Sequence, residues 1–448
     1  MKRRGFLARL GALAGGLLVW PRRRAAASPL AAAGAGAGHG GIVTARQAGG
    51  QLLVPMDDAQ NDHLKAYGIA YDAVRRGGHV EWLLNYRGGS FLLPDDGDTR
   101  RGATLAGVTA AGVTALQVVD IRGTIEQANM DSELLERAPR VAVYQPPFSP
   151  PWDDAVTMAL QYARIPFTRV WDPEVLGGRL AEFDWLHLHH EDFTGQYSKF
   201  YLTYAGAPWL TDMVRANQAA ARHLGYPDVP ALKKAVARTI RGFVERGGFL
   251  FAMCAATETL ELALAAQHVD IAASFADGTP MDPDADAKLD WTQALACQNA
   301  HLVMDPGIPA FSDIDGHQVN NPGHRQPLGA FELFNFSAKI DPVYTMLVQC
   351  HRQVIPDFYG VTTSFTRHTL KPADIILAEE PGAPWVKYIH GDRGQGTWTY
   401  LGGHDPEDPE HQVGAPPTDL SLHPHSPGYR LILNNVLFPA AKKHELKT

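Results

Sequence analysis

Two stretches of the chain repeat one pattern: a short apolar run, an amphipathic segment with helical period, and a second apolar run. The pattern predicts strands at 52–56, 79–84, 140–145 and 167–171 and helices at 62–76 and 153–164. In both stretches the strands start about 27 residues apart, which is typical of the βαβ unit of a parallel sheet. We therefore expect an α/β protein with doubly wound, flavodoxin-like parallel sheets, in an N-terminal half at 41–136 and a larger domain at 137–448.

A sharp strand-to-helix turn is predicted further along the chain. Residues 232–246 predict a helix, 247–251 a strand and 257–267 a second helix, and Cys254 stands at the turn between the last two. Such an elbow requires small residues two positions before and after its apex, and this chain has alanine at both. The N–H groups that open the second helix are expected to lower the pKa of the thiol and to supply an oxyanion donor. The alternative is a buried core cysteine, since free cysteine is among the most buried residue types.

The end of the chain predicts a histidine at the same edge of the sheet. Residues 385–390 and 396–401 alternate as a hairpin, and a closing helix is expected at 429–440. The second strand runs into Gly-Gly-His404, and a glycine pair lets the backbone approach another segment closely. Because parallel strands end at one sheet edge, we expect His404 to lie near Cys254. Alternatively, His404 is one more loop histidine among the 19 of this chain.

A strand predicted within 183–192 carries two further histidines. His187 and His189 fall on one face of this strand, and Glu191 and Asp192 follow them. Two histidines with nearby acids could hold a divalent metal. Histidines at the end of a strand also line polar clefts without a metal, and the sequence leaves both possibilities open.

Two segments are expected to be insertions in the larger domain. The segment at about 197–230 carries several aromatic residues and delays the helix that leads to the elbow. The segment at 268–370 is rich in Asp, Pro and Gly in its first half and predicts a long, partly irregular excursion.

The first 40 residues predict an export signal and linker. Arg3 and Arg4 precede a modest apolar stretch at 11–20, followed by three arginines and small residues. That stretch is too short to remain as a permanent membrane span. We expect export by the twin-arginine route and a periplasmic or extracellular location. The alternative is a disordered basic N-terminus.

Charge narrows the possible partners. Residues 1–40 hold seven of the 40 basic residues and none of the 48 acidic ones, so the remainder has a net charge of −15. Such an acidic protein is a poor candidate for binding nucleic acid or an anionic membrane. The three cysteines leave at least one thiol unpaired. A Cys297–Cys350 disulfide would leave Cys254 free.

The order of elbow cysteine, later strand, histidine and nearby acid resembles the class I glutamine amidotransferase-like superfamily. The ending Gly-Gly-His-Asp before a final helix is most similar to its trehalose-utilisation branch. The resemblance implies that Cys254 is the nucleophile, His404 the base and Glu407 the orienting acid, with Asp405 as its competitor. The superfamily's Gly-Gly-Pro oxyanion loop is replaced here by residues 190–195.

Most of the chain also resembles exported bacterial proteins often labelled asparagine synthetase B, particularly at 61–68 and 82–90. Synthetases of that kind need a cysteine directly after the initiator methionine, where this chain has Lys2. They also need a Ser-Gly-Gly-x-Asp-Ser loop for pyrophosphate, which the sequence lacks. ATP-dependent asparagine synthesis is therefore not expected.

These observations predict an exported cysteine-dependent hydrolase that acts on an amide or ester. Its partner would be a small-molecule, peptide-linked or glycan-linked amide. This interpretation requires no cofactor. The alternative is a non-catalytic binding module, or a module with a divalent metal site, on a degenerate amidotransferase-like fold.

Overall fold

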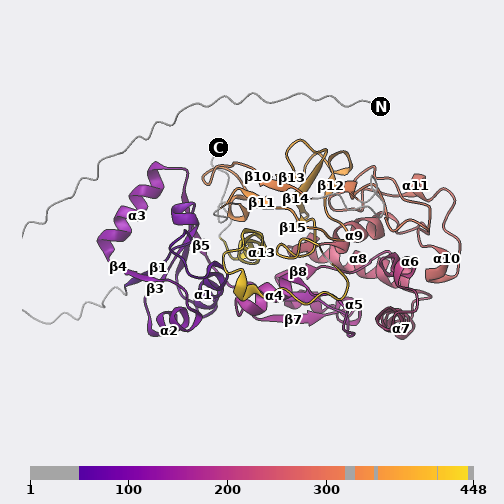
Figure 1. Ribbon diagram of the computed structural model, residues 1–448, viewed down its shortest axis with the longest axis horizontal. Coiled ribbons are helices and arrows are strands. Elements are labelled where there is room, and N and C mark those ends of the chain that lie inside the picture. The colour runs from indigo at the N-terminus through magenta and orange to yellow at the C-terminus, as the bar shows by residue number, and fades with distance from the viewer. Residues whose placement is uncertain (1–49, 318–327, 348–351, 411, 442–448) are drawn as a thin grey trace, which may run out of the picture. The chain divides into compact units, whose positions relative to one another are not determined.

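The computed structural model describes residues 50–317, 328–347, 352–410 and 412–441 (Figure 1). The predicted export signal and Cys350, the expected disulfide partner of Cys297, lie outside the described residues. The described residues all belong to one compact unit. Within the described ranges, none of the helices combines the length and apolar character needed to cross a membrane.

The N-terminal sheet is antiparallel. Its five strands stand in the order β4-β1-β3-β2-β5, and every neighbouring pair is antiparallel. Its elements are β1 (Gln51–Val54), α1 (His63–Arg75), β2 (Val80–Leu84), β3 (Ser90–Pro94), α2 (Gly97–Ala106), β4 (Ala111–Val113), α3 (Ala115–Gln127) and β5 (Asp131–Leu135).

The predicted parallel, doubly wound sheet is therefore wrong for this half. The strands and helix of the first unit are present, but β3 lies between β1 and β2. The reason is the turn after β2, where Asn85, Arg87, Gly88 and Gly89 all have positive φ. This turn reverses the chain at once, so that β3 pairs with β2 and then with β1.

The second sheet has ten strands and mixes both directions. Five strands, β15-β9-β8-β6-β7, are parallel, and the rest of the path, β11-β10-β13-β14, joins β15 through antiparallel pairs. The parallel strands are β6 (Val141–Tyr144), β7 (Phe167–Val170), β8 (Trp185–Leu188), β9 (Phe249–Met253) and β15 (Gly396–Leu401). The others are β10 (Ala330–Leu333), β11 (Val354–Pro356), β12 (Phe365–Thr366), β13 (Ile375–Glu379) and β14 (Trp385–Arg393). The chain is thus a mixed α/β protein.

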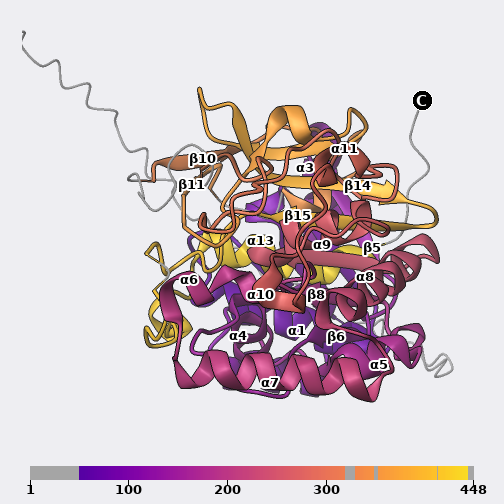
Figure 2. The same ribbon diagram turned by 90° about the vertical axis from the view of Figure 1, so that its right-hand side faces the viewer.

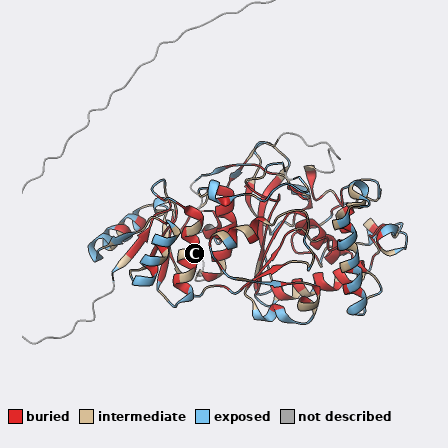
Figure 3. Cartoon of the chain, turned by 60° about the horizontal axis from the view of Figure 1, so that its bottom comes forward, coloured by how far each residue is buried: buried red, intermediate tan, exposed pale blue. Residues whose placement is uncertain are grey.

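Helices pack on both faces of this sheet because its strands bury alternate residues on opposite sides. Val141 and Val143 of β6 join a core with α1, α4 (Ala155–Tyr162) and α13 (Pro427–Leu437). Ala142 and Tyr144 join a second core with α5 (Asp172–Leu176), α8 (Val229–Glu245) and α9 (Ala255–Ala265). Figure 2 shows α8 and α9 beside β8 and β15. In Figure 3 the interior of the molecule is mostly buried, and the exposed residues lie on the helices and loops of its surface.

The two expected insertions differ in structure. The segment at 197–230 contains α6 (Tyr201–Tyr204) and α7 (Pro208–His223). In its described parts, the segment at 268–370 is largely irregular and contains α10 (Ser274–Asp277), α11 (Ala285–Lys288) and the short strands β10 to β12.

Candidate functional site

The turn at Cys254 has the backbone of an elbow. Cys254 follows β9 directly, precedes α9, and has φ 50° and ψ −138°. A positive φ is uncommon for a residue with a side chain and costs free energy, which the packing around it must offset. Ala252 and Ala256 are both fully buried, which explains the small residues on either side of the turn.

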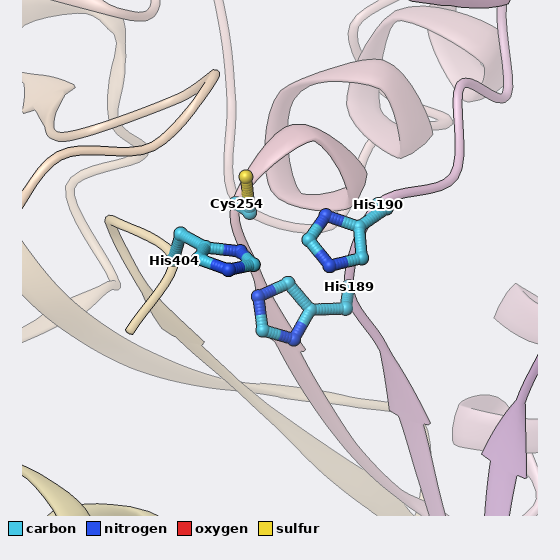
Figure 4. A group of neighbouring side chains, drawn as sticks. All are labelled: His189, His190, Cys254 and His404. Atoms are coloured by element: carbon cyan, nitrogen blue, oxygen red, sulfur yellow. The ribbon is translucent and has the colours of Figure 1, made fainter. Parts of the chain in front are cut away.

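Strand pairing brings distant histidines to this turn. Leu188 at the end of β8 pairs with Ala252, and Leu401 at the end of β15 pairs with Met253. The segments after the three strands therefore meet at one edge of the sheet. One ligand atom from each of His189, His190, Cys254 and His404 lies within 4.8 Å of the other three (Figure 4). The structure thus brings Cys254 and His404 together, 150 positions apart.

The glycine pair before His404 is needed for close backbone packing. A Cβ at Gly402 would lie 2.2 Å from the carbonyl oxygen of Thr363, and one at Gly403 would lie 2.5 Å from the ring of Phe358. The N–H of His404 donates to the carbonyl oxygen of Tyr359 at 2.7 Å. The segment 358–363 is held in this way over the cysteine.

The acid beside His404 is Asp153 and not Glu407. Oδ1 of Asp153 lies 2.6 Å from Nε2 of His404. Oε2 of Glu407 instead lies 2.9 Å from Nδ1 of His423. The physical reason is a turn in which the N–H of Glu407 donates to the Asp405 carboxylate at 2.9 Å, which directs Glu407 away from the sheet edge.

Asp405, the competing acid, has other partners. Its carboxylate accepts a hydrogen bond from the hydroxyl of Thr418 at 2.7 Å. Asp153 comes from the loop between β6 and α4, where its neighbour Asp154 caps the helix by accepting from the N–H of Thr157 at 2.7 Å. In the sequence, Asp153 can be recognised as one of two adjacent acids that follow the first parallel strand, at the sheet edge where ligands bind.

The thiol and the imidazole are both held in their neutral forms. Sγ of Cys254 is fully buried and accepts a hydrogen bond from the N–H of Val361 at 3.2 Å. Burial raises the pKa of Cys254 to about 11, because desolvation of a thiolate outweighs the nearby N–H donors. The expected lowering of this pKa is therefore wrong. Burial, reinforced by the neighbouring His189, holds the pKa of His404 well below its usual value.

His187 and His189, the predicted metal pair, are buried in a group with Asp154. Nε2 of His187 lies 3.3 Å from Nδ1 of His189, and Oδ1 of Asp154 lies 3.6 Å and 3.5 Å from those two nitrogens. Nδ1 of His187 also lies 3.0 Å from the carbonyl oxygen of Phe251. Burial acts to raise the pKa of Asp154, but the two histidines outweigh it and hold that pKa well below its usual range.

A cavity of about 400 Å³ adjoins these residues. Asp153, Asp154 and His190 line it on the side of the cluster, and Trp152 and Trp171 supply aromatic walls. His190 therefore lines the cavity and also places a ring nitrogen within 4.8 Å of the Cys254 sulfur. Strand alternation would place His190 on the face opposite to His187 and His189, so the sequence pattern does not indicate it. In the structure β8 ends at Leu188, and the ring of His190 stacks on that of His189 with 4.1 Å between centroids.

Comparison with known proteins adds little. Neither a family model nor a curated protein matches the chain. Among solved structures, the chain is similar to the cytoplasmic protein STM3548 from Salmonella typhimurium, with 10% identity and a TM-score of 0.32 over 68% of this chain and 100% of that one. It is also similar to the cytoplasmic protein STM1381 from Salmonella typhimurium LT2, with 12% identity and a TM-score of 0.30 over 67% of this chain and 99% of that one. Likenesses at this level assign neither a fold nor a function.

Proposed function

We propose that the protein is a cysteine-dependent hydrolase of an amide or ester, with Cys254 as nucleophile, His404 as base and Asp153 as the acid that orients the base. The observation that carries the proposal is the elbow cysteine with a nitrogen of His404 within 4.8 Å of its sulfur, together with the 2.6 Å contact between Nε2 of His404 and a carboxylate. Nucleophile, base and orienting acid in this order are the arrangement that activates a weak nucleophile.

The reaction follows from these contacts. Because Nε2 of His404 donates to Asp153, Nδ1 is the nitrogen that takes the thiol proton as the sulfur attacks the substrate carbonyl. The N–H groups of Ala255 and Val361, both near the sulfur, would donate to the oxyanion. His404 then returns the proton to the leaving amine or alcohol, and water hydrolyses the thioester.

This mechanism can start from a neutral Cys254 thiol and a neutral His404 imidazole. A neutral thiol beside a neutral imidazole loses its proton only as the carbon–sulfur bond forms, as a serine hydroxyl does in related triads. The adjoining cavity, with its aromatic walls and polar edge, is the place where an acyl group would bind.

The proposal includes the finer fold assignment and the location. The five parallel strands with helices on both faces support a doubly wound, amidotransferase-like domain around the site. The paired arginines at the start of the sequence support activity in the periplasm or outside the cell.

Acyl trapping tests the proposal. The protein would be incubated with p-nitrophenyl esters and acyl-aminocoumarins of graded acyl size, and the adducts would be located by peptide mass spectrometry. We expect an acyl group on Cys254 that is lost in Cys254→Ser and kept in Cys297→Ser, which removes the other buried thiol of the described residues. Absence of an adduct across the panel, or an adduct that forms equally fast in His404→Ala, would overturn the triad.

A further inference from the structure

We propose that His189, His190, Cys254 and His404 together bind one divalent transition-metal ion, with Zn²⁺ the best match. The observation is that three imidazoles and one thiol, from the ends of three parallel strands, place a ligand atom each within 4.8 Å of the others (Figure 4). Imidazole and thiolate are the ligands that Zn²⁺ prefers, and four protein ligands make a closed tetrahedral site. This inference does not depend on the hydrolase activity.

The donor atoms need only a small contraction to bind an ion. Zinc–nitrogen bonds of about 2.0–2.1 Å and a zinc–sulfur bond of about 2.3 Å place tetrahedral donors about 3.3–3.7 Å apart. Side-chain rotations that move each donor inward by about an ångström would reach this geometry from a 4.8 Å spread.

Each histidine is oriented by a contact at its other ring nitrogen. Nε2 of His404 lies 2.6 Å from the carboxylate of Asp153, and Nε2 of His190 lies 2.6 Å from the carbonyl oxygen of the same residue. With Nε2 of both rings facing Asp153, Nδ1 is the nitrogen of each ring that would face the ion. Carboxylate and carbonyl partners of this kind fix the tautomer and orientation of metal-binding histidines.

His189 is oriented in the opposite sense. Its Nδ1 faces Oδ1 of Asp154 at 3.5 Å and Nε2 of His187 at 3.3 Å. Its Nε2 is buried and has no hydrogen-bond partner within the described part of the chain. A buried polar atom without a partner is costly, and a bound ion at this position would remove that cost. In Figure 4 one ring nitrogen of His189 points toward His404.

The charge around the four donors also suits a cation. The Cys254 thiolate would supply one negative charge, and Asp153 and Asp154 stand behind the histidines. The second group, Asp154 with His187 and His189, is a weaker candidate because it offers three ligands that already contact one another.

The hydrolase proposal and the metal-site proposal both use Cys254 and His404, so each constrains the other. A metal-bound sulfur and imidazole are not available for attack and proton transfer, so the metal-bound form would be inactive toward acyl donors. Metal binding, with no acylation of the metal-free protein, would sink the hydrolase and leave the metal site standing. Acylation without metal binding would do the reverse.

Cobalt substitution tests the site. The full chain would be stripped of metal with a chelator and titrated with Co²⁺, which reports thiolate ligation by charge-transfer absorption and tetrahedral geometry by intense visible bands. We expect one Co²⁺ per chain, displaced by Zn²⁺. The thiolate band should vanish in Cys254→Ser and persist in Cys297→Ser and in His390→Gln, which alters a buried histidine beside Thr399 outside the cluster. Asp153→Asn should weaken binding by about 10–100-fold.

Three results would overturn the metal site. The first is wild-type protein that gives no thiolate band with Co²⁺. The second is an affinity unchanged by both Cys254→Ser and Asp153→Asn. The third is metal lost in His187→Gln but retained in Cys254→Ser, which would place the ion in the Asp154 group. Thermal unfolding of each variant shows which substitutions leave the fold intact, and the absence of a thiolate band in the wild-type spectrum overturns the site without any variant.

Discussion

Asp153 and His404 are 251 positions apart in the chain, and their side chains lie 2.6 Å from each other. One belongs to the loop after β6 and the other follows β15, and both strands run in the same direction within one sheet. The contact therefore joins the loop after β6 to the segment after β15, two strands that β9 and β8 separate, at the edge where Cys254 turns into α9. Because of this contact, Asp153 and not Glu407 is expected to orient the imidazole of His404.

Asp153→Asn should slow acylation of Cys254 by about 10²–10⁴-fold, the range seen when general-base catalysis is removed. The amide cannot stabilise an imidazolium, and it allows the wrong tautomer of His404. Glu407→Gln is the matched control and should leave the rate within about twofold, because Glu407 contacts His423 instead. Rates of acyl-adduct formation by mass spectrometry decide between them. The opposite ranking would return the orienting role to Glu407.

The buried carboxyl of Glu258 should make the stability of the fold depend on pH. Burial raises the pKa of this carboxyl from 4.5 to about 8, while Ser312 and Thr362 donate to it at 2.6 Å and 3.0 Å. Between those two values the unfolded chain releases the proton and the folded chain keeps it, so this group lowers stability as pH rises. Above about 8 both states are ionised and the effect levels off.

Glu258→Gln removes this titration. We expect the variant to be more stable than wild type at pH 8, with a gap that shrinks as pH falls toward 4.5. Urea unfolding of both proteins across this range measures the gap, and only the difference between them is compared, because other acids titrate in both. A gap that does not change with pH would contradict the prediction.

Local patterns predicted the elements of the site well. The elbow at Cys254 and the strand before His404 follow from short-range periodicity, glycine positions and small residues, all of which are legible in the sequence. Their meeting was also predictable, because parallel strands end at one edge.

The strand order of the first sheet, the acid beside His404 and the pKa of Cys254 could not be predicted, because they depend on tight turns and on contacts between distant segments. The place of β3 between β1 and β2 is set by a left-handed turn at 85–89, which no periodicity reveals. The choice of Asp153 over Glu407 likewise depends on one tight turn at Asp405 and on a loop from another strand. The pKa of Cys254 depends on burial by the distant segment 358–363.

Lys233 and Asp172 form a buried ion pair at 2.9 Å, with side chains 5% and 0% exposed. Lys233→Met should destabilise the fold by about 3–5 kcal/mol, because it leaves a carboxylate buried without its cation. The double variant with Asp172→Asn should recover part of that loss. Arg101→Met is the control, since the Arg101–Asp98 pair is 72% and 64% exposed, and should change stability by less than about 1 kcal/mol. Urea unfolding measures all three, and equal effects would argue against the buried pair.

Export is tested by substitution at the paired arginines. Changing Arg3 and Arg4 to lysine together should retain the protein in the cytoplasm, because the twin-arginine route reads that pair. Cell fractionation and immunoblotting give the distribution, and Arg22→Lys with Arg23→Lys serves as a control that keeps the same charge. An unchanged distribution after the first substitution would sink the export hypothesis.

The close packing of Gly403 against Phe358 stabilises the fold and keeps the segment 358–363 over Cys254, so replacing Gly403 should impair both. Gly403 has φ +96°, and a Cβ there would lie 2.5 Å from the ring of Phe358 and 2.9 Å from its carbonyl oxygen. Gly403→Ala would therefore push the 358–363 segment away from the residue before His404, at a cost of about 1–3 kcal/mol for overpacking in addition to backbone strain. Gly414→Ala is the matched control, because Gly414 has φ +84° with no atom within 4 Å of an added Cβ.

If the segment shifts, Gly403→Ala should lose stability and its Cys254 should react faster with iodoacetamide, since Val361 no longer covers the sulfur. Gly414→Ala should show the backbone strain alone, with alkylation as in wild type. Equal stability losses and equal alkylation rates in the two variants would mean that the close approach at Gly403 does not hold this segment over the cysteine.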